Sequence, residues 1–262
     1  MIRLLRIEVI KNWTYPTFWI IVVLYFFILG TGLFNLRDLI DSLNFTISSE
    51  GNIDTSLFPI LKFPDIWHNI AYLSGYLKLL LGIYIAVSVT NEYSFNTLRQ
   101  NLMQGMTASE FVASKFITIL NLSIPSTLFL FGVGLIIADY SSGEIINVFS
   151  GSEYVLAYFA SLLFYLTFVV MVGLWIKKTG LTIVLVILYP LILEPMIRWV
   201  LPDYLDKFFP FYSLDELIPF PFTKYIGTGG YEQIDLFYFG VVVAWTVAFL
   251  GISYFILKRR DI

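Results

Sequence analysis

The chain has 262 residues, of which 58% are hydrophobic and only 13% are charged, with a net charge of −3 and a mean hydropathy of +0.80. Soluble domains carry about 25% charged residues, so this chain has too few charges to coat a water-soluble surface, and we expect lipid to cover much of it. The net negative charge provides no positive surface potential that would attract nucleic acid. The absence of cysteine excludes disulfides, thiolate metal sites and cysteine nucleophiles.

The N-terminal stretch MIRLLRIEVIKNW predicts a helix that lies on the membrane surface. Ile2, Leu5, Val9 and Trp13 fall near one helical face, while basic residues occupy the rest. A basic tail that only sets topology is the alternative. The apolar run that follows is long and has no small-residue cleavage site, so we expect a retained membrane helix rather than a signal peptide.

Six apolar segments are each long enough to cross a bilayer, which needs about 20 mainly apolar residues. Because a helix satisfies its backbone hydrogen bonds within its own segment, we expect an all-α integral membrane protein, with residues 1–262 forming one transmembrane domain. Pro125, Pro190 and Pro195 predict kinks in the third and fifth spans. The six predicted spans cover residues 17–34, 70–89, 116–138, 154–176, 181–201 and 236–257.

The polar interval NEYSFNTLRQNLMQGMTASEFVASK, between spans two and three, predicts a lateral helix, a corner and a second helix. Gly105 is placed as a left-handed C-terminal cap. Thr107 and Glu110 form a T-x-x-E capping box for the next helix. A long loop that is simply well ordered is the alternative. The lateral helix has one apolar face, made of residues three or four apart: Phe95, Leu98, Leu102 and Met106.

The other connections differ in kind. Residues 35–69 form a long outer loop, whereas KKTG alone joins spans four and five and predicts a tight hairpin. Residues 202–235 are rich in Phe, Tyr and Pro, too broken by proline to span and too apolar for a free loop. We expect short interfacial or re-entrant helices there, with an ordinary aromatic-rich loop as the alternative.

The placement of lysine and arginine predicts the orientation of the chain. Ten of the sixteen lie on one side, which the positive-inside rule assigns to the cytoplasm. Both termini are therefore expected to be cytoplasmic, in the cell membrane. These ten are Arg3, Arg6, Lys11, Arg99, Lys115, Lys177, Lys178, Lys258, Arg259 and Arg260.

Three charged residues fall inside predicted spans, namely Lys78, Glu194 and Arg198. A charge in mid-membrane costs about 2.5–3.5 kcal/mol on insertion scales, so such residues are structural or line a pathway. Glu194 and Arg198 are four residues apart and can pair on one helix, which is the interpretation we favour. Alternatively, Lys78 reaches Glu194 across the bundle and gates an outer pathway.

No catalytic, metal or cofactor site is expected on this chain. The segment GLWIKKT, residues 173–179, lacks the second glycine of a phosphate-binding loop. His68 is the one histidine, and neither H-E-x-x-H nor G-x-S-x-G occurs.

The topology and the polar corner together resemble an ABC-2 type transporter permease. Members of that family often carry a glutamate at the end of span two, a Gly-Thr-Leu segment, a turn, and a lysine that begins span three. This chain has Glu92, Thr97-Leu98, the turn at residues 105–108, and Lys115. It departs at Asn96, where glycine is usual, and at residues 106–108.

The resemblance implies a non-catalytic permease subunit of an ATP-driven exporter. Segment 92–106 would be a coupling helix that docks on a separate ATP-binding subunit, which holds ATP and Mg. Two such ATPases and a second permease chain, as homodimer or heterodimer, would complete the assembly within membrane lipids. The implied coupling residues are Glu92, Phe95, Leu98, Arg99, Leu102, Gly105, Thr107 and Glu110.

Two other functions stay open. An ion-coupled secondary transporter would place acidic residues deep in several spans, and only Glu194 fits. A non-transporting membrane scaffold or assembly factor would also suit a chain with few polar groups in its spans. The sequence does not specify a substrate, although the low charge favours a hydrophobic or amphiphilic one.

Overall fold

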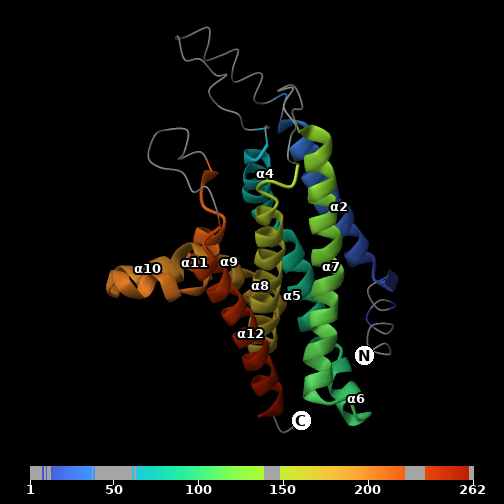
Figure 1. Cartoon of the computed structure of the whole chain (residues 1–262). Helices are drawn as coiled ribbons and strands as arrows, with labels where there is room; N and C mark the ends of the chain where they lie inside the picture. The colour runs from blue at the N-terminus through green and yellow to red at the C-terminus, as the bar shows by residue number, and fades with distance from the viewer. Residues whose placement is uncertain are drawn as a thin grey trace, which may run out of the picture.

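The computed structural model describes residues 8, 10, 13–36, 38, 61, 63–138, 148–221 and 234–259, and all regular structure within these ranges is helical (Figure 1). The all-helical prediction is therefore confirmed for the described part. The longer helices are α2 (Pro16–Phe34), α4 (Asp65–Gly75), α5 (Lys78–Ser94), α7 (Ala108–Ile137), α8 (Glu153–Ile176), α9 (Thr179–Leu188) and α12 (Leu236–Lys258).

Five helices among the described residues are long and apolar enough to cross a membrane, and the bent pair α4 and α5 makes a sixth if it is one span. By length and composition, this indicates a multi-pass membrane protein. The predicted boundaries of the first, fourth, fifth and sixth spans agree within a few residues. The helix of the third span begins at Ala108 rather than at residue 116, and the second span begins at Asp65 and bends by 41° between Gly75 and Lys78. The bend follows Ser74-Gly75, since such pairs are common sites of sharp helix kinks.

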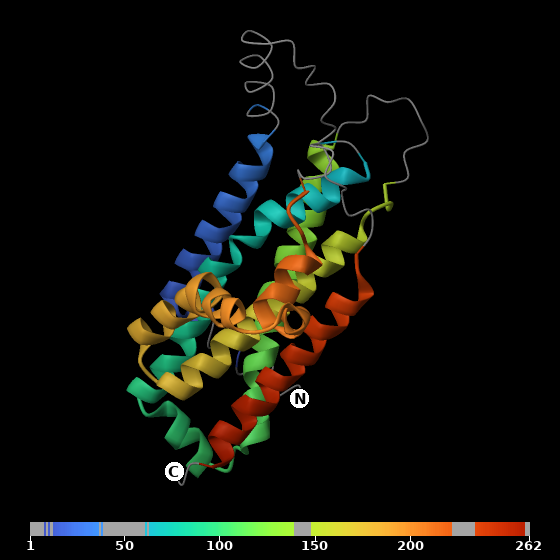
Figure 2. The same ribbon diagram turned by 90° about the vertical axis from the view of Figure 1, so that its left-hand side faces the viewer.

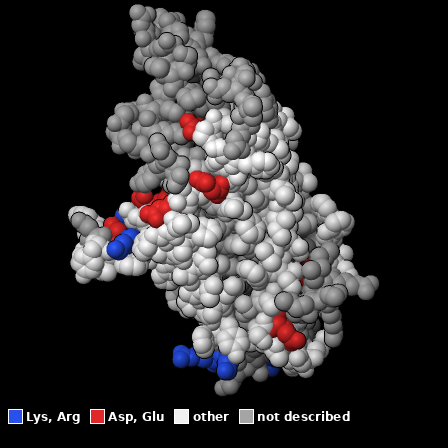
Figure 3. Space-filling model, viewed as in Figure 1, with Lys and Arg blue, Asp and Glu red and all other residues white. Residues whose placement is uncertain are grey.

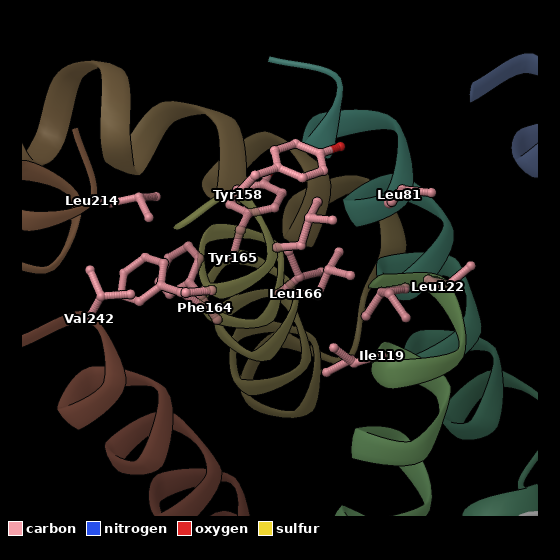
Figure 4. Packing of buried hydrophobic residues seen from close by; sticks show 14 of the residues in the cluster. Leu81, Ile119, Leu122, Tyr158, Phe164, Tyr165, Leu166, Leu214 and Val242 are labelled. Carbon is pink, nitrogen blue, oxygen red and sulfur yellow. The ribbon is translucent and has the colours of Figure 1, made fainter. Parts of the chain in front are cut away.

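Helix α8 is the centre of the bundle. Of its most apolar window, 78% is buried, compared with 17% in α2, and α8 packs against α4, α5, α7 and α12. Figure 4 shows Ile119 of α7 and Val242 of α12 pointing toward the α8 side chains from opposite sides. This packing leaves most of the apolar window of α2 and of α12 exposed, with 17% and 28% buried.

Two glycines allow neighbouring helices to approach closely, as small residues do in membrane bundles. A Cβ atom on Gly134 would lie 2.6 Å from Cζ3 of Trp67 and 2.7 Å from Cδ1 of Ile70. A Cβ atom on Gly82 would lie 2.6 Å from Cε1 of Tyr165. A larger residue at either position would require these side chains to shift.

The predicted fifth span is one continuous helical run, Thr179–Val200, but it is not regular. A π-helical turn, η2 (Tyr189–Leu193), separates α9 from α10 (Glu194–Val200). Pro190 and Pro195 lie in these two segments, and each lacks the N–H that a regular α-helix needs. Figure 1 shows α10 lying across the direction of α7 and α8, with Trp199 almost fully exposed.

Short helices form between the last two spans, as predicted. These are the 3₁₀ helix η3 (Asp203–Phe208) and α11 (Pro210–Leu217). Phe211 of α11 is buried among the rings of Phe164, Phe168 and Tyr189, so this part is not an ordinary loop. Residues 222–233, and most of the predicted surface helix at 1–13 and of the loop at 35–69, lie outside the described residues.

The predicted hairpin between spans four and five is confirmed. Helix α8 ends at Ile176 and α9 begins at Thr179, with Lys177 in the left-handed conformation at φ 62°. Figure 2 shows α6 (Thr97–Met103) and the C terminus at the same end of the bundle, which is also the lower end in Figure 1.

Candidate functional site

The polar interval folds into a corner, residues 91–115, that joins α5 to α7 through α6. Helix α5 continues to Ser94, and Asn96 then takes a left-handed conformation with φ 55° before α6 begins at Thr97. The predicted single helix over 92–106 is therefore wrong, and α6 is only seven residues long. Asparagine is one of the few non-glycine residues that enter this conformation readily, so Asn96 produces the break.

The end of α6 and the start of α7 follow the prediction closely. Gly105 is left-handed at φ 94°, and the N–H groups of Gly105 and Met106 donate to the carbonyls of Leu102 and Asn101, at 3.0 and 3.1 Å. This pair of bonds defines a Schellman motif. Thr107 and Glu110 make both bonds of the capping box, so the corner is fixed on both sides.

Of the four residues predicted to form one apolar face, Leu98, Leu102 and Met106 pack against the bundle, whereas Phe95 is exposed. Leu98 is buried with 4% of its surface exposed, whereas Phe95 is 66% exposed and Met103 is 70% exposed. The predicted alignment of Phe95 with Leu98 is wrong, because the left-handed Asn96 turns α6 away from the axis of α5. Leu98 anchors α6 to the bundle and leaves Phe95 and Met103 accessible.

A buried charge cluster lies where the corner joins the bundle. Nζ of Lys115 in α7 donates to Oε1 of Glu92 in α5 and lies 3.4 Å from Oε1 of Glu8. Thr118 donates its hydroxyl to Oε2 of Glu8 at 2.9 Å. No more than 7% of any of the three charged side chains is exposed. Removing Lys115, the cation of this cluster, would leave two buried carboxylates uncompensated.

This cluster ties three segments of the chain together at the base of α6. Glu8 belongs to the N-terminal segment, and Glu92 lies four residues before Asn96. Lys115, counted in the sequence as a basic residue of the cytoplasmic side, is instead buried in α7. Glu8 was missed because its partner lies 107 residues away, and no local pattern marks such a pairing.

Glu194 has a different partner from either expectation. Its buried carboxylate accepts the backbone N–H groups of Phe211 and Tyr212, at 2.9 and 2.7 Å. These are two of the unpaired donors at the N terminus of α11, where the helix dipole also favours a negative charge. The predicted pairing of Glu194 with Arg198 is wrong, since the carboxylate caps α11.

Arg198 pairs instead with Asp206 of η3, with 2.9 Å between Nη2 and Oδ2. Its guanidinium also lies 3.9 Å from the ring centroid of Tyr212. Burial, reinforced by the charge of Glu216, raises the pKa of Tyr212 to about 12, which keeps this phenol neutral.

Lys78 does not meet Glu194 among the described residues. Its ammonium lies 5.9 Å from the ring centroid of Tyr165 and acts electrostatically on Asp215 of α11. The alternative of a Lys78–Glu194 gate is therefore wrong as well, because the Glu194 carboxylate is held by α11.

His68 has a structural role in the described part of the chain. Its ring stacks on Tyr154 with 4.1 Å between centroids, and Nε2 donates to the carbonyl of Pro219 at 2.8 Å. These contacts hold the start of α4 against α8 and the chain that follows α11.

The basic side chains gather near the corner end of the molecule. Lys177, Lys178 and Lys258 are exposed there, and Figure 3 shows blue side chains at the lower end, while most of the red ones lie higher. The exposed face of α6 thus shares one end of the bundle with a group of lysines.

A family model described as a protein of unknown function, DUF2705, matches residues 17–262, whereas no family of ABC-2 permeases matches. Comparison with curated proteins finds no match to the chain. The inferred ABC-2 permease membership is therefore wrong. The motif behind it covers a capped helix and a glycine-ended turn, and these are local solutions open to any membrane bundle. The chain belongs to the family of proteins of unknown function described as DUF2705.

Proposed function

We propose that this chain is the membrane subunit of a transport system and that a separate ATP-hydrolysing protein drives it by docking on the corner. The support closest to the site is that the corner has one buried and one exposed side. Leu98 is buried in the bundle, and Phe95 and Met103 beside it are exposed. Exposed apolar residues at a polar end of a membrane protein suit a protein contact better than water.

The connections of the corner suit the transmission of movement. Helix α6 has a fixed break on each side, at Asn96 and at Gly105. The Lys115 cluster joins the chain on both sides of α6, through Glu92 in α5 and its own position in α7. A partner that shifts α6 would therefore act on two helices that both pack against α8.

The sidedness of the corner supports the same proposal. Residues 91–115 lie at the end of the bundle that holds exposed lysines and the C terminus. The positive-inside rule favours a cytoplasmic position for that end, where ATP is available to a partner. A ligand-driven change still requires that the partner bind two states of the corner with different affinity.

Co-purification with an ATPase assay tests the proposal. The full chain, tagged and extracted in mild detergent, should bring down a protein that hydrolyses ATP. Replacing both exposed residues, Phe95→Asp with Met103→Asp, should reduce the recovered ATPase activity at least tenfold. Leu98 is left intact because it is buried.

A matched control uses Phe149→Asp, an exposed apolar residue outside the corner, 71% accessible, which should retain the activity. Recovery of the same ATPase by the Phe95 and Met103 double variant would refute docking on α6. Absence of ATPase activity from the wild-type preparation would refute the ATP-driven partner altogether.

A further inference from the structure

A cavity of about 520 Å³ opens on the side of the bundle where α4 and α5 bend apart. Its walls come from α4 and α5, from α8, from η2 and from α11. This volume lies within the range of about 300–1,000 Å³ that small-molecule sites occupy. The cavity is separate from the corner and from the Lys115 cluster, none of whose residues line it.

Apolar side chains such as Leu79, Ile187 and Leu214 line part of the cavity. Three charged residues of the described part of the chain also line it, namely Lys78 of α5 and Asp215 and Glu216 of α11. Their formal charges sum to −1. Among the described residues, Lys78 has no carboxylate within ion-pair distance, so it forms no direct ion pair with Asp215.

Aromatic rings complete the wall. Tyr72, Tyr76 and Tyr165 all line the cavity, and the hydroxyls of Tyr72 and Tyr76 bond each other at 2.6 Å. The face of a tyrosine ring attracts cations, as the position of Lys78 over Tyr165 already shows. Asp215 is exposed, so a ligand can reach its carboxylate.

We propose that this cavity binds a hydrophobic organic cation, an ammonium or phosphonium centre carried on an apolar body. The carboxylates of Asp215 and Glu216 would face the cation, the tyrosine rings would surround it, and Leu79 and Ile187 would contact the apolar body. The positive charge of Lys78 would repel the cation and so lower its affinity. That the cation is a transported ligand rests on the proposed transport function. Its binding to the purified chain does not require the ATPase partner, so a failed binding assay and a failed co-purification would be distinguishable.

Binding of radiolabelled tetraphenylphosphonium to the purified chain in dodecyl maltoside tests the proposal. The wild type should bind it saturably, whereas tetraphenylborate, the anion of nearly the same shape, should not compete. The double variant Asp215→Asn with Glu216→Gln should lose at least tenfold in affinity. Lys78→Met should gain about threefold, because it removes the positive charge of Lys78 from the wall.

Glu153→Gln, which removes an exposed acid outside the cavity, should leave the affinity unchanged. The thermal midpoint of each variant is measured in the same preparation. If the double variant does not fold, Asp215→Asn alone should still weaken binding about threefold. Unsaturable binding by the wild type, equal binding by the acidic variants, or weaker binding by Lys78→Met would each overturn the proposal.

A lipid amine could supply the same chemistry as a free cation. Adding phosphatidylethanolamine to the assay separates the two sources. Displacement of the probe would assign the site to an aminolipid headgroup, and retention of the probe would assign it to a free cation. Either result keeps a cation-binding cavity.

Discussion

Two regions of the bundle, the Lys115 cluster and the cavity beside α11, differ in how their charged side chains are buried. In the cluster beside the corner, Lys115 is enclosed with Glu8 and Glu92, and no more than 7% of any of these three side chains is exposed. Around α11, the charges are spread, and Lys78 and Asp215 border a cavity that a ligand can enter. A closed cluster can only hold segments together, whereas charges left at a cavity wall remain available to a ligand. The charges of the first region should therefore control stability, and those of the second should control binding.

The largest effect should come from Lys115→Met. It leaves Glu8 and Glu92 buried beside each other without a cation, which costs about 3–5 kcal/mol when a buried ion pair is broken from one side. Lys78→Met should change stability by less than about 1 kcal/mol, as is usual for residues outside a buried network. Unfolding of the purified chain in mild detergent measures both. Equal effects of the two substitutions would contradict the contrast between the regions.

Glu8→Gln tests whether the cation contributes more to stability than one of the two carboxylates of the cluster. It retains an acceptor for Thr118 and leaves Lys115 paired with Glu92, so its effect should be far smaller than that of Lys115→Met.

Glu194→Leu should have the next largest effect. It removes the acceptor for two buried amides at the start of α11, and an unsatisfied buried donor costs about 1–3 kcal/mol. Glu194→Gln keeps one carbonyl oxygen and should lose less. Thermal unfolding in detergent measures the difference, with Glu153→Gln as the exposed control. If Leu and Gln at this position behaved alike, the carboxylate would not be the cap that holds α11.

Asn96→Val should destabilise the corner by about 1–2 kcal/mol, because a left-handed backbone costs about that much for most residues, whereas asparagine is one of the exceptions that adopt it readily. Asn96→Gly should be tolerated, since glycine adopts φ 55° without strain. Limited proteolysis of residues 91–115 and the unfolding midpoint check both variants. A valine variant as resistant as the wild type would show that the left-handed turn is not needed.

Sequence patterns within a few residues predicted much of the structure, but they did not predict contacts between residues far apart in the chain. Gly105 and the Thr107–Glu110 box act within a few residues, so the pattern alone reveals the turn. Apolar length likewise predicted the spans. The meeting of Glu8 with Lys115, and of Glu194 with the amides of α11, depends on how whole helices pack, and the sequence has no periodicity that encodes it.

The smallest expected effect concerns pH at the cavity. Desolvation by the surrounding protein raises the pKa of Asp215, Lys78 opposes the rise, Glu216 adds to it, and Arg198 opposes it. Asp215 therefore takes up a proton at a higher pH than the ordinary aspartate value of about 3.9. As pH falls through that raised pKa, the cavity loses one negative charge and should bind tetraphenylphosphonium less tightly. The loss should stay below about tenfold, which corresponds to 1.4 kcal/mol, because Glu216 still lines the wall.

Other groups near Asp215 could add to the same pH profile. Tyr72 of α4 lies close enough to interact electrostatically with Asp215, but its phenol is neutral throughout the acidic pH range. His68 is bonded to Pro219, which also lines the cavity. Asp215→Asn separates these contributions, because it removes the carboxyl titration and keeps His68. If the acidic fall in binding persisted unchanged in Asp215→Asn, the titrating group would be another residue. The charge of Asp215 would then not control binding of the cation in the cavity.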